Sequence, residues 1–250
     1  MGKPNQIELP DRTRAAILYE DRSVLAIDKP AGWMLAPESW AKGSRNLQRA
    51  LMLSVQARDH WARSRNLRYV RFVHRLDAET SGVLLLAKTP GALSVLSGLF
   101  ETRQVRKKYL AVVRGHPPQS QWICRLKIAP APGAIGRMQA GEAGGKPAET
   151  AFTVLQQGRE CALIEAVPVT GRTHQIRLHL AAAGHPVLGD ALYGKAGPAL
   201  ALRAVEIAYT DPFQKRPVRI TAPIGEFLRR HHFAVSAGPA RPLTLPGSRS

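Results

Sequence analysis

Residues 74–87 read HRLDAETSGVLLLA, a charged segment that passes directly into a continuous apolar run. The apolar run, residues 82–87, is typical of a strand buried on both faces, and the preceding residues 69–73 (YVRFV) predict a second strand. Gly82 permits a tight turn from loop to strand. The sequence therefore predicts a polar loop around Asp77 between two strands, although such a loop taken alone is usually a solvated turn.

Outside this stretch the chain mixes helix and strand patterns without strict alternation, which predicts an α+β fold. Pro90 suits the first turn of a helix, and Thr173 suits the N-cap of another that ends before Gly184. We expect further strands at residues 16–19, 24–27, 107–114, 151–155, 161–168 and 218–221, and further helices at 45–63 and 224–230.

Three segments differ in composition. Residues 1–14 are expected to form a flexible lead-in, and residues 15–235 a single domain. Residues 236–250 are rich in Pro, Gly, Ser and Arg, so we expect a disordered basic tail.

The charge of the chain is strongly unbalanced. It has 36 Lys and Arg against 18 Asp and Glu in 250 residues, a formal net charge of +18. Such an excess predicts a polyanionic partner: RNA, DNA or an anionic membrane surface.

No stretch approaches the roughly 20 apolar residues of a membrane span, and no signal-peptide run opens the chain, so we expect a cytoplasmic protein. Cys124 and Cys161 lie too far apart for a CxxC pair, so neither a disulfide framework nor a zinc site is expected.

Several motifs accompany residues 74–82 in a fixed order. They are DKPAG at 28–32, KYLAVVRG at 108–115, GKPAET at 145–150, GRTHQIRLHL at 171–180, and GHP at 184–186 followed by GD at 189–190 and YG at 193–194. Together they resemble the RluA-type pseudouridine synthases, which act on large-subunit ribosomal RNA and tRNA. The resemblance covers residues 17–227 and implies a mixed, largely antiparallel sheet flanked by helices and loops. It also implies isomerisation of uridine to pseudouridine without a cofactor or a metal.

The chain departs from this family at a few positions. Some members carry a small RNA-binding domain at the N-terminus, and none fits before Ile17. Leu202-Arg203-Ala204 and Asp211-Pro212 replace the Leu-His-Ala and His-Pro often found there, and Ala36 replaces a frequent His. None of these positions belongs to the expected chemistry.

The resemblance also implies roles for individual residues. Asp77 would be the catalytic carboxylate, and it would attack the anomeric carbon, attack the uracil ring or take a sugar proton. Arg177 would keep Asp77 ionised, because a nearby cation offsets the effect of burial. Tyr109 would stack on the flipped uracil, and Arg75 would enter the RNA stack in its place. The remaining RNA-binding candidates are His74, which would mainly order the loop, and the phosphate contacts Lys29, Lys107, Lys108 and Arg172.

Other readings remain open on the residues alone. Arg177 could be a surface arginine, Tyr109 a core tyrosine, and each lysine a solvated cation. A non-catalytic RNA-binding protein would explain the charge, but it has no use for a buried carboxylate facing RNA. A metal-dependent nuclease is a weaker alternative, because it needs clustered carboxylates and only Asp77 and Glu79 are close together in this loop. We expect a monomer, and ribosomal RNA and tRNA are not distinguished.

Overall fold

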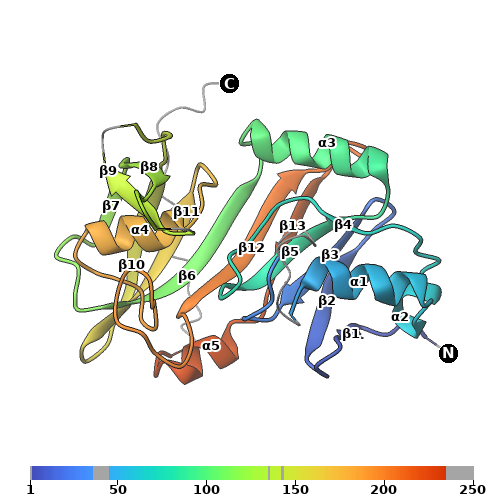
Figure 1. The fold of residues 1–250 in the computed structure, drawn as a ribbon, viewed down its shortest axis with the longest axis horizontal. Coiled ribbons are helices and arrows are strands. Elements are labelled where there is room, and N and C mark those ends of the chain that lie inside the picture. Colours follow the sequence, from blue (N-terminus) through green and yellow to red (C-terminus); the bar gives the residue numbers. More distant parts are fainter. Residues whose placement is uncertain (1, 36–44, 135, 142–143, 235–250) are drawn as a thin grey trace.

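The computed structural model describes residues 2–35, 45–134, 136–141 and 144–234. These residues build an eleven-stranded, largely antiparallel sheet that runs through the molecule (Figure 1). Neighbouring strands follow the order β1 (Gln6–Glu8), β2 (Arg14–Glu20), β3 (Val24–Lys29), β5 (Ser81–Ala87), β12 (Leu202–Thr210), β6 (Arg106–Arg114), β11 (Cys161–Pro168), β10 (Thr150–Gln157) and β7 (Gln121–Cys124). In addition, β4 (Arg71–Phe72) pairs with β5, and β13 (Pro217–Thr221) pairs with β12. A separate hairpin joins β8 (Lys127–Pro130) to β9 (Met138–Gly141).

The described residues form five helices: α1 (Leu47–Gln56), α2 (His60–Arg63), α3 (Pro90–Glu101), α4 (Gln175–Ala182) and α5 (Gly225–Arg230). Side-chain caps define two of their starts. The Asn46 side chain accepts a hydrogen bond from the Arg49 amide at 3.0 Å, and the Thr89 hydroxyl accepts one from the Ala92 amide at 3.1 Å. Such caps satisfy amides that have no partner within the helix.

The half of the sheet that contains β3 and β5 is covered on both faces. On one face, α1 and α2 pack over Leu25, Ile27, Leu84 and Leu86. On the other face, α3 and β13 pack over Val24, Ala26, Val83 and Leu85. Successive residues of a strand point to opposite faces, so residues 82–87 are all buried.

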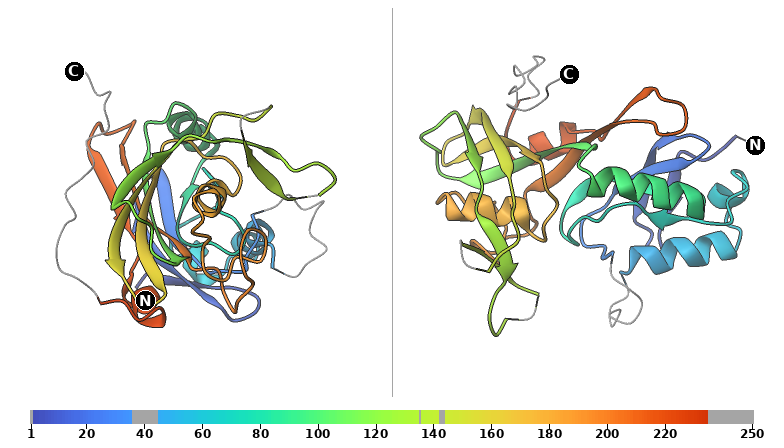
Figure 2. Two further views of the ribbon diagram at one scale, coloured as in Figure 1. Left: turned by 90° about the vertical axis from the view of Figure 1, so that its left-hand side faces the viewer. Right: turned by 90° about the horizontal axis from the view of Figure 1, so that it is seen from above.

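The other half of the sheet is covered by α4 and α5. Ile176 and Leu180 of α4 and Leu228 of α5 join Val112, Phe152 and the remaining residues of one apolar cluster. Helix α4 is buried from Gln175 through Leu180. Figure 2 shows α1 and α4 on the same side of the sheet, where the β8–β9 hairpin also projects.

Strand β12 joins the two halves. It pairs parallel to β5 through Arg203 and Ala204, and antiparallel to β6. Gly82 lies at the close approach, with a φ of +115°, and a Cβ atom built there would lie 2.0 Å from the Ala204 carbonyl oxygen. Any larger residue at this position would force the strands apart, so Gly82 is required by the junction as well as by the turn.

Much of the sequence-based prediction is confirmed. The α+β class and the mixed, largely antiparallel sheet are as expected. The apolar run at 82–87 lies in β5, Pro90 begins α3, and the tyrosine strand is β6. No helix in the described part of the chain is long and apolar enough to span a membrane.

Four local expectations are wrong. The lead-in contains β1, and its Ile7 and Leu9 are buried in the core. The helix expected at 45–63 is interrupted near Arg58, which has a φ of 56°. The N-cap position of α4 is His174 rather than Thr173, and its side chain forms no capping hydrogen bond. Strand β12 was not expected at all. Ala36 and the expected tail at 236–250 lie outside the described residues, and the limits of the domain stay a prediction.

Candidate active site

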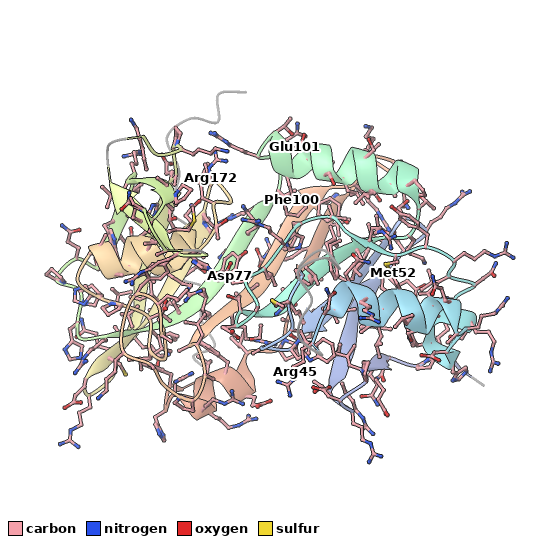
Figure 3. The ribbon with its side chains drawn as sticks, in the orientation of Figure 1. Arg45, Met52, Asp77, Phe100, Glu101 and Arg172 are labelled. Atoms are coloured by element: carbon pink, nitrogen blue, oxygen red, sulfur yellow. The ribbon has the colours of Figure 1, made fainter. Side chains whose placement is uncertain are left out.

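A cleft of about 610 Å³ opens above the centre of the sheet. Its walls come from the loop at residues 73–80, the end of α3, strand β6, and the segment from Pro168 into α4. Figure 3 shows Asp77 near the middle of the molecule, with Phe100 and Glu101 of α3 and Arg172 above it in this view. The first three elements follow one another in the chain, but strands β7 to β10 separate them from the segment that begins at Pro168, so the cleft exists only in the folded chain.

The loop that carries Asp77 is held from below by a buried lysine. The Lys29 side chain is 0% exposed, and its Nζ donates hydrogen bonds to the carbonyl oxygens of Pro30, Ala78 and Thr80 at 3.1, 2.7 and 2.9 Å. Burial lowers the pKa of Lys29 to about 8, although the nearby Glu79 and Asp77 charges oppose this. The expected phosphate contact at Lys29 is therefore wrong: its amine faces the loop from inside.

Asp77 itself lies on the wall of the cleft with partial access to solvent. Its side chain is 24% exposed, and its Oδ2 lies 3.6 Å from Nη1 of Arg177. Tyr109 of β6 lines the same cleft. Burial, and then the charge of Asp77, raise the pKa of Tyr109, so the phenol stays protonated at neutral pH. The sequence prediction that Asp77, Tyr109 and Arg177 come together is thus matched by their placement around one cleft.

Arg177 has a closer partner than Asp77. Its Nε and Nη2 donate hydrogen bonds to the two carboxylate oxygens of Asp190, both at 2.7 Å. The two side chains are 4% and 0% exposed. Burial disfavours the charged guanidinium, but the hydrogen bonds and charge of Asp190 outweigh it and raise the pKa of Arg177. Sequence reasoning missed this pairing, although the GD dipeptide at 189–190 lies in a matched motif.

A polar network fixes the start of α4. The side-chain amide of Gln175 donates to the Glu149 carbonyl and to the Thr150 hydroxyl, both at 2.9 Å. Its Oε1 accepts from the Arg172 amide at 2.9 Å and from the Thr170 hydroxyl at 2.7 Å. This network ties α4 to the adjacent strand, and it explains how so short a helix presents Arg177 at a defined angle.

Tyr193 connects α4 to the β8–β9 hairpin. Its hydroxyl accepts a hydrogen bond from the Met138 amide at 3.0 Å and lies 2.8 Å from Nδ1 of His174. The Tyr193 ring lies 5.3 Å from Cζ of Arg177. His174 has a φ of 55°, a left-handed conformation that is unusual for a residue with a side chain. Neither His174 nor Tyr193 was predicted as a site residue.

His74 lines the cleft, but the contacts of its ring are with β5 and α3, which order the loop. Its Nε2 accepts a hydrogen bond from the Leu85 amide at 3.1 Å, and its ring stacks on Phe100 with centroids 4.7 Å apart. Burial, together with the charge of Lys107, lowers the pKa of His74 to about 3, so the ring is neutral. The geometry fits the expected role in ordering the loop and leaves no imidazolium to bind phosphate.

The remaining basic candidates divide between the two faces of the sheet. Arg75, Lys107 and Arg172 line the cleft. Arg75 donates a hydrogen bond to the Thr173 hydroxyl on the opposite wall, and Nζ of Lys107 donates to the Thr170 carbonyl at 3.0 Å. Lys108 is not among the described residues that line the cleft, and its Nζ lies 2.9 Å from Oε2 of Glu165. It is therefore not among the phosphate contacts that we propose.

The cleft thus combines the partly exposed carboxylate of Asp77, the guanidinium of Arg177 beside it and the protonated phenol of Tyr109. Its rim carries the cations Arg75, Lys107 and Arg172. Among the described residues, no group of three or more His, Cys, Asp or Glu side chains could hold a metal ion. A carboxylate next to a fixed cation can remain ionised in a desolvated site, as a nucleophile or a general base requires. The cationic rim suits a polyanionic substrate.

This fold and this site define an RNA-modifying isomerase. Residues 23–182 match the family model described as RNA pseudouridylate synthase, and the chain belongs to this family. It is therefore an RNA pseudouridine synthase. Among curated relatives, it is 37% identical to ribosomal large subunit pseudouridine synthase C of Escherichia coli K12, over 86% of this chain and 68% of that protein. It is 34% identical to the enzyme of the same name from Vibrio vulnificus, over 86% of this chain and 67% of that protein.

Solved structures agree with this assignment. Human RNA pseudouridylate synthase domain containing 1 superposes with a TM-score of 0.66 at 29% sequence identity, over 84% of this chain and 83% of that one. The resemblance proposed from the motifs is thereby confirmed at the level of the family and the fold.

Proposed function

We propose that this enzyme isomerises uridines of large-subunit ribosomal RNA, with Asp77 as the catalytic carboxylate. The observation that carries the proposal is the position of Asp77. It is a partly exposed carboxylate on the wall of a basic cleft, 3.6 Å from a buried arginine. Making pseudouridine requires the glycosidic bond to break, the base to rotate, and C5 to bond to the sugar. Three pathways are possible, in which the carboxylate attacks the sugar, attacks the uracil ring or removes a sugar proton. Asp77 could act in each of them.

The target uridine has to leave the RNA stack to reach Asp77. Enzymes that act on a base extrude it into a pocket, at a cost of a few kcal/mol. The cleft, at about 610 Å³, lies within the range of about 300–1,000 Å³ for small-molecule sites and can hold a nucleotide. In this proposal Tyr109 stacks on the uracil, and the exposed Arg75 fills the gap left in the RNA, where its planar guanidinium stacks and hydrogen-bonds.

The choice of ribosomal RNA rests on the relatives, whose names state that they act on the large ribosomal subunit. The net charge of +18 supports a large polyanionic substrate. In this proposal Lys107 and Arg172 contact phosphates at the rim, and the enzyme works as a monomer in the cytoplasm. A tRNA target remains the alternative.

The catalytic assignment is tested by Asp77→Asn, which keeps the shape of the side chain but can neither attack nor accept a proton. We expect turnover on a ribosomal RNA substrate to be lost while RNA binding and the melting temperature stay close to those of the wild type. Glu79→Gln is the matched control, because Glu79 is an exposed carboxylate of the same loop that is not among the described residues lining the cleft. Appreciable turnover by purified Asp77→Asn would remove Asp77 from the mechanism.

The substrate is tested separately by mapping pseudouridines in cells with and without the gene. We expect positions in large-subunit ribosomal RNA to lose the modification and to regain it when the wild type, but not Asp77→Asn, is restored. Loss confined to tRNA would overturn the ribosomal assignment and leave the catalytic one intact.

A further inference from the structure

We propose that Asp190 is a positioning residue that holds Arg177 at a fixed distance from Asp77 and neutralises most of its charge. The proposal rests on the proposed catalytic role of Asp77. Arg177 lies between two carboxylates that it contacts unequally: Asp190 through two hydrogen bonds of 2.7 Å, and Asp77 through one contact of 3.6 Å.

The geometry of the guanidinium explains this inequality. The edge formed by Nε and Nη2 is fully used by Asp190, and the contact to Asp77 comes from Nη1. A bidentate arginine–carboxylate pair is strong and strongly directional. Because that edge is occupied, the side-on bidentate pair through Nε is not available to Asp77, which Arg177 contacts through Nη1. The catalytic carboxylate therefore keeps a cation beside it without giving up its oxygens to that cation.

Asp190 is itself anchored by its own turn. Its Oδ1 accepts hydrogen bonds from the amides of Leu192 and Tyr193 at 3.0 and 3.1 Å, in addition to the one from Arg177. The side chain is 0% exposed, so it cannot swing into solvent. Burial disfavours its charge, but the hydrogen bonds and charge of Arg177 lower the pKa of Asp190, so it is ionised at neutral pH. The anchor is thus a fixed negative charge at a fixed place.

Loss of this charge has a definite consequence. Arg177 would become a buried cation without its main counter-ion, and Asp77 is the other carboxylate within its reach. We expect Arg177 to move onto Asp77, to occupy the oxygens needed for chemistry, and to hold Asp77 more firmly in its ionised form. The other titratable groups whose charges interact with Asp77 stay in place in this change; they are Lys29 of β3, Tyr109 of β6, His174 before α4, and Tyr193.

The test is Asp190→Asn, with single-turnover rates measured across pH at saturating RNA. We expect the rate at neutral pH to fall about 10²-fold, as for small misplacements of a reacting group, with RNA affinity nearly unchanged. The acidic limb of the pH–rate profile should move to lower pH by about one unit, because a negative charge near Asp77 has been removed. Arg177→Met removes a positive charge and should move the same limb to higher pH. Opposite shifts from two members of one ion pair are not expected of a residue with a merely structural role.

Asp211→Asn is the matched control. Asp211 is also a buried aspartate, and its Oδ1 also accepts hydrogen bonds from the amides two and three residues later, at 2.8 and 3.2 Å. It lies in the turn between β12 and β13, and no ion pair involves it in the described part of the chain. Asp211→Asn should therefore leave the rate and the acidic limb unchanged.

The double variant Asp190→Asn/Arg177→Met keeps the test decisive if Asp190→Asn alone does not fold. With Arg177 absent there is nothing left to position, so the double variant should match Arg177→Met in its rate above the acidic limb. The limb itself should lie at lower pH than in Arg177→Met, because the charge of Asp190 is also removed. A further loss in the double variant would show that Asp190 acts independently of Arg177 and would overturn the proposal. Failure of both Asp190 variants to fold would make Asp190 a structural residue and would overturn the proposal as well. An active Asp77→Asn would instead remove the proposed function itself, so the two failures are distinguishable.

Discussion

The two walls of the cleft are anchored by opposite means. The wall that carries Asp77 is a loop, and a buried cation, Lys29, holds it through main-chain carbonyl oxygens. The wall that carries Arg177 is a helix, and a buried anion, Asp190, holds the side chain itself. In the first wall the anchor fixes the path of the backbone, and in the second it fixes one charged group. Changes to the two anchors should therefore have different effects.

The largest expected effect, on both stability and turnover, comes from replacing Arg177 in the wall formed by α4. Arg177→Met leaves Asp190 buried without a counter-ion, and removing one partner of a buried pair costs about 3–5 kcal/mol. Thermal or denaturant unfolding of the variant should show this loss of free energy of unfolding. Turnover should be nearly abolished near neutral pH and partly recovered at higher pH, while Arg177→Lys, which keeps the charge without the planar fork, should be intermediate.

The pH dependence of stability gives this prediction a sign. In the wild type the pKa of Asp190 lies below its ordinary value of 3.8, so its contribution is present above that pH and is lost as the pH falls further. In Arg177→Met, burial, which is the largest effect on Asp190 and raises its pKa, is opposed by the hydrogen bonds from the Leu192 and Tyr193 amides without the help of Arg177. We expect the pKa of Asp190 to rise, so the variant should gain stability as the pH falls from neutral. Arg125→Met is the control, because in its pair with Glu149 the two side chains are 63% and 30% exposed, and such a pair should contribute about 0–1 kcal/mol. An Arg177→Met protein as stable as the wild type would contradict the buried pair.

An intermediate effect is expected from replacing Lys29, which supports the loop that carries Asp77. Lys29→Met keeps the apolar stem but leaves the carbonyl oxygens of Pro30, Ala78 and Thr80 without this donor. The Ala78 oxygen keeps its hydrogen bond from the Gly32 amide at 2.9 Å. A buried group left unpaired costs about 1–3 kcal/mol, and removal of a poorly solvated ammonium offsets part of that, so we expect a net loss of about 2 kcal/mol. Turnover should also fall, because the loop that carries Asp77 loses this support and becomes less ordered.

Lys88→Met separates loop support from general stability. Nζ of Lys88 also binds a main-chain carbonyl, that of Asp21 at 2.7 Å, together with the Glu20 carboxylate, but these partners lie at the end of β2 and directly after it, and not in the Asp77 loop. This variant should lose stability without losing turnover at saturating RNA. Equal losses of turnover in the two lysine variants would refute a specific role of Lys29 in supporting the loop.

The smallest expected effect comes from replacing Lys107, one of the cations at the rim of the cleft. It is compared with the effect of replacing Lys108, which lies on the opposite face of β6. Burial lowers the pKa of Lys107 to about 8, so its charge is present at pH 7 and is lost as the pH rises through 8. RNA affinity should therefore weaken between about pH 7 and 9, and the slope of log affinity against log salt should fall by roughly 0.7–0.9 for one phosphate contact. Lys107→Met should be weaker at pH 7 and lack that part of the pH dependence.

Lys108→Met is the matched control for the rim, since Lys108 is the next residue of β6 and pairs with Glu165. Its RNA affinity and salt slope should equal those of the wild type. If both lysine variants bound RNA equally poorly, the separation of the two faces of β6 would not describe how RNA is bound.

The sequence was most informative where the signal is local. The apolar run at 82–87 predicts its strand because burial on both faces needs six consecutive apolar or small residues, and no other part of the chain has to be known. The loop around Asp77 follows from that strand and from the motif. The family resemblance then brings Tyr109 and Arg177 to the same cleft, which periodicity alone could not do.

The errors arise where tertiary packing decides. Lys29 looks like a solvated cation because lysines are rarely buried, and only the carbonyl oxygens of a loop 49 and 51 residues away reveal its role. The pairing of Arg177 with Asp190 depends on a turn folding back onto α4. Strand β12 escaped prediction because Arg203 and Glu206 interrupt its apolar pattern, and both are paired with acidic or basic neighbours in the fold.

The position of β12 bears on when the enzyme becomes active during synthesis. Strands β5 and β6 follow each other in the chain, yet the sheet separates them by β12, which bonds back to β5 through Arg203 and Ser81, 122 residues apart. Contacts so distant in sequence form slowly, because a long loop has to close first. We therefore expect β5 and β6 of a nascent chain, and with them Asp77 and Tyr109, to stay apart until β12 has left the ribosome and inserted between these strands. We expect the ability to modify RNA to be acquired late, in a single step.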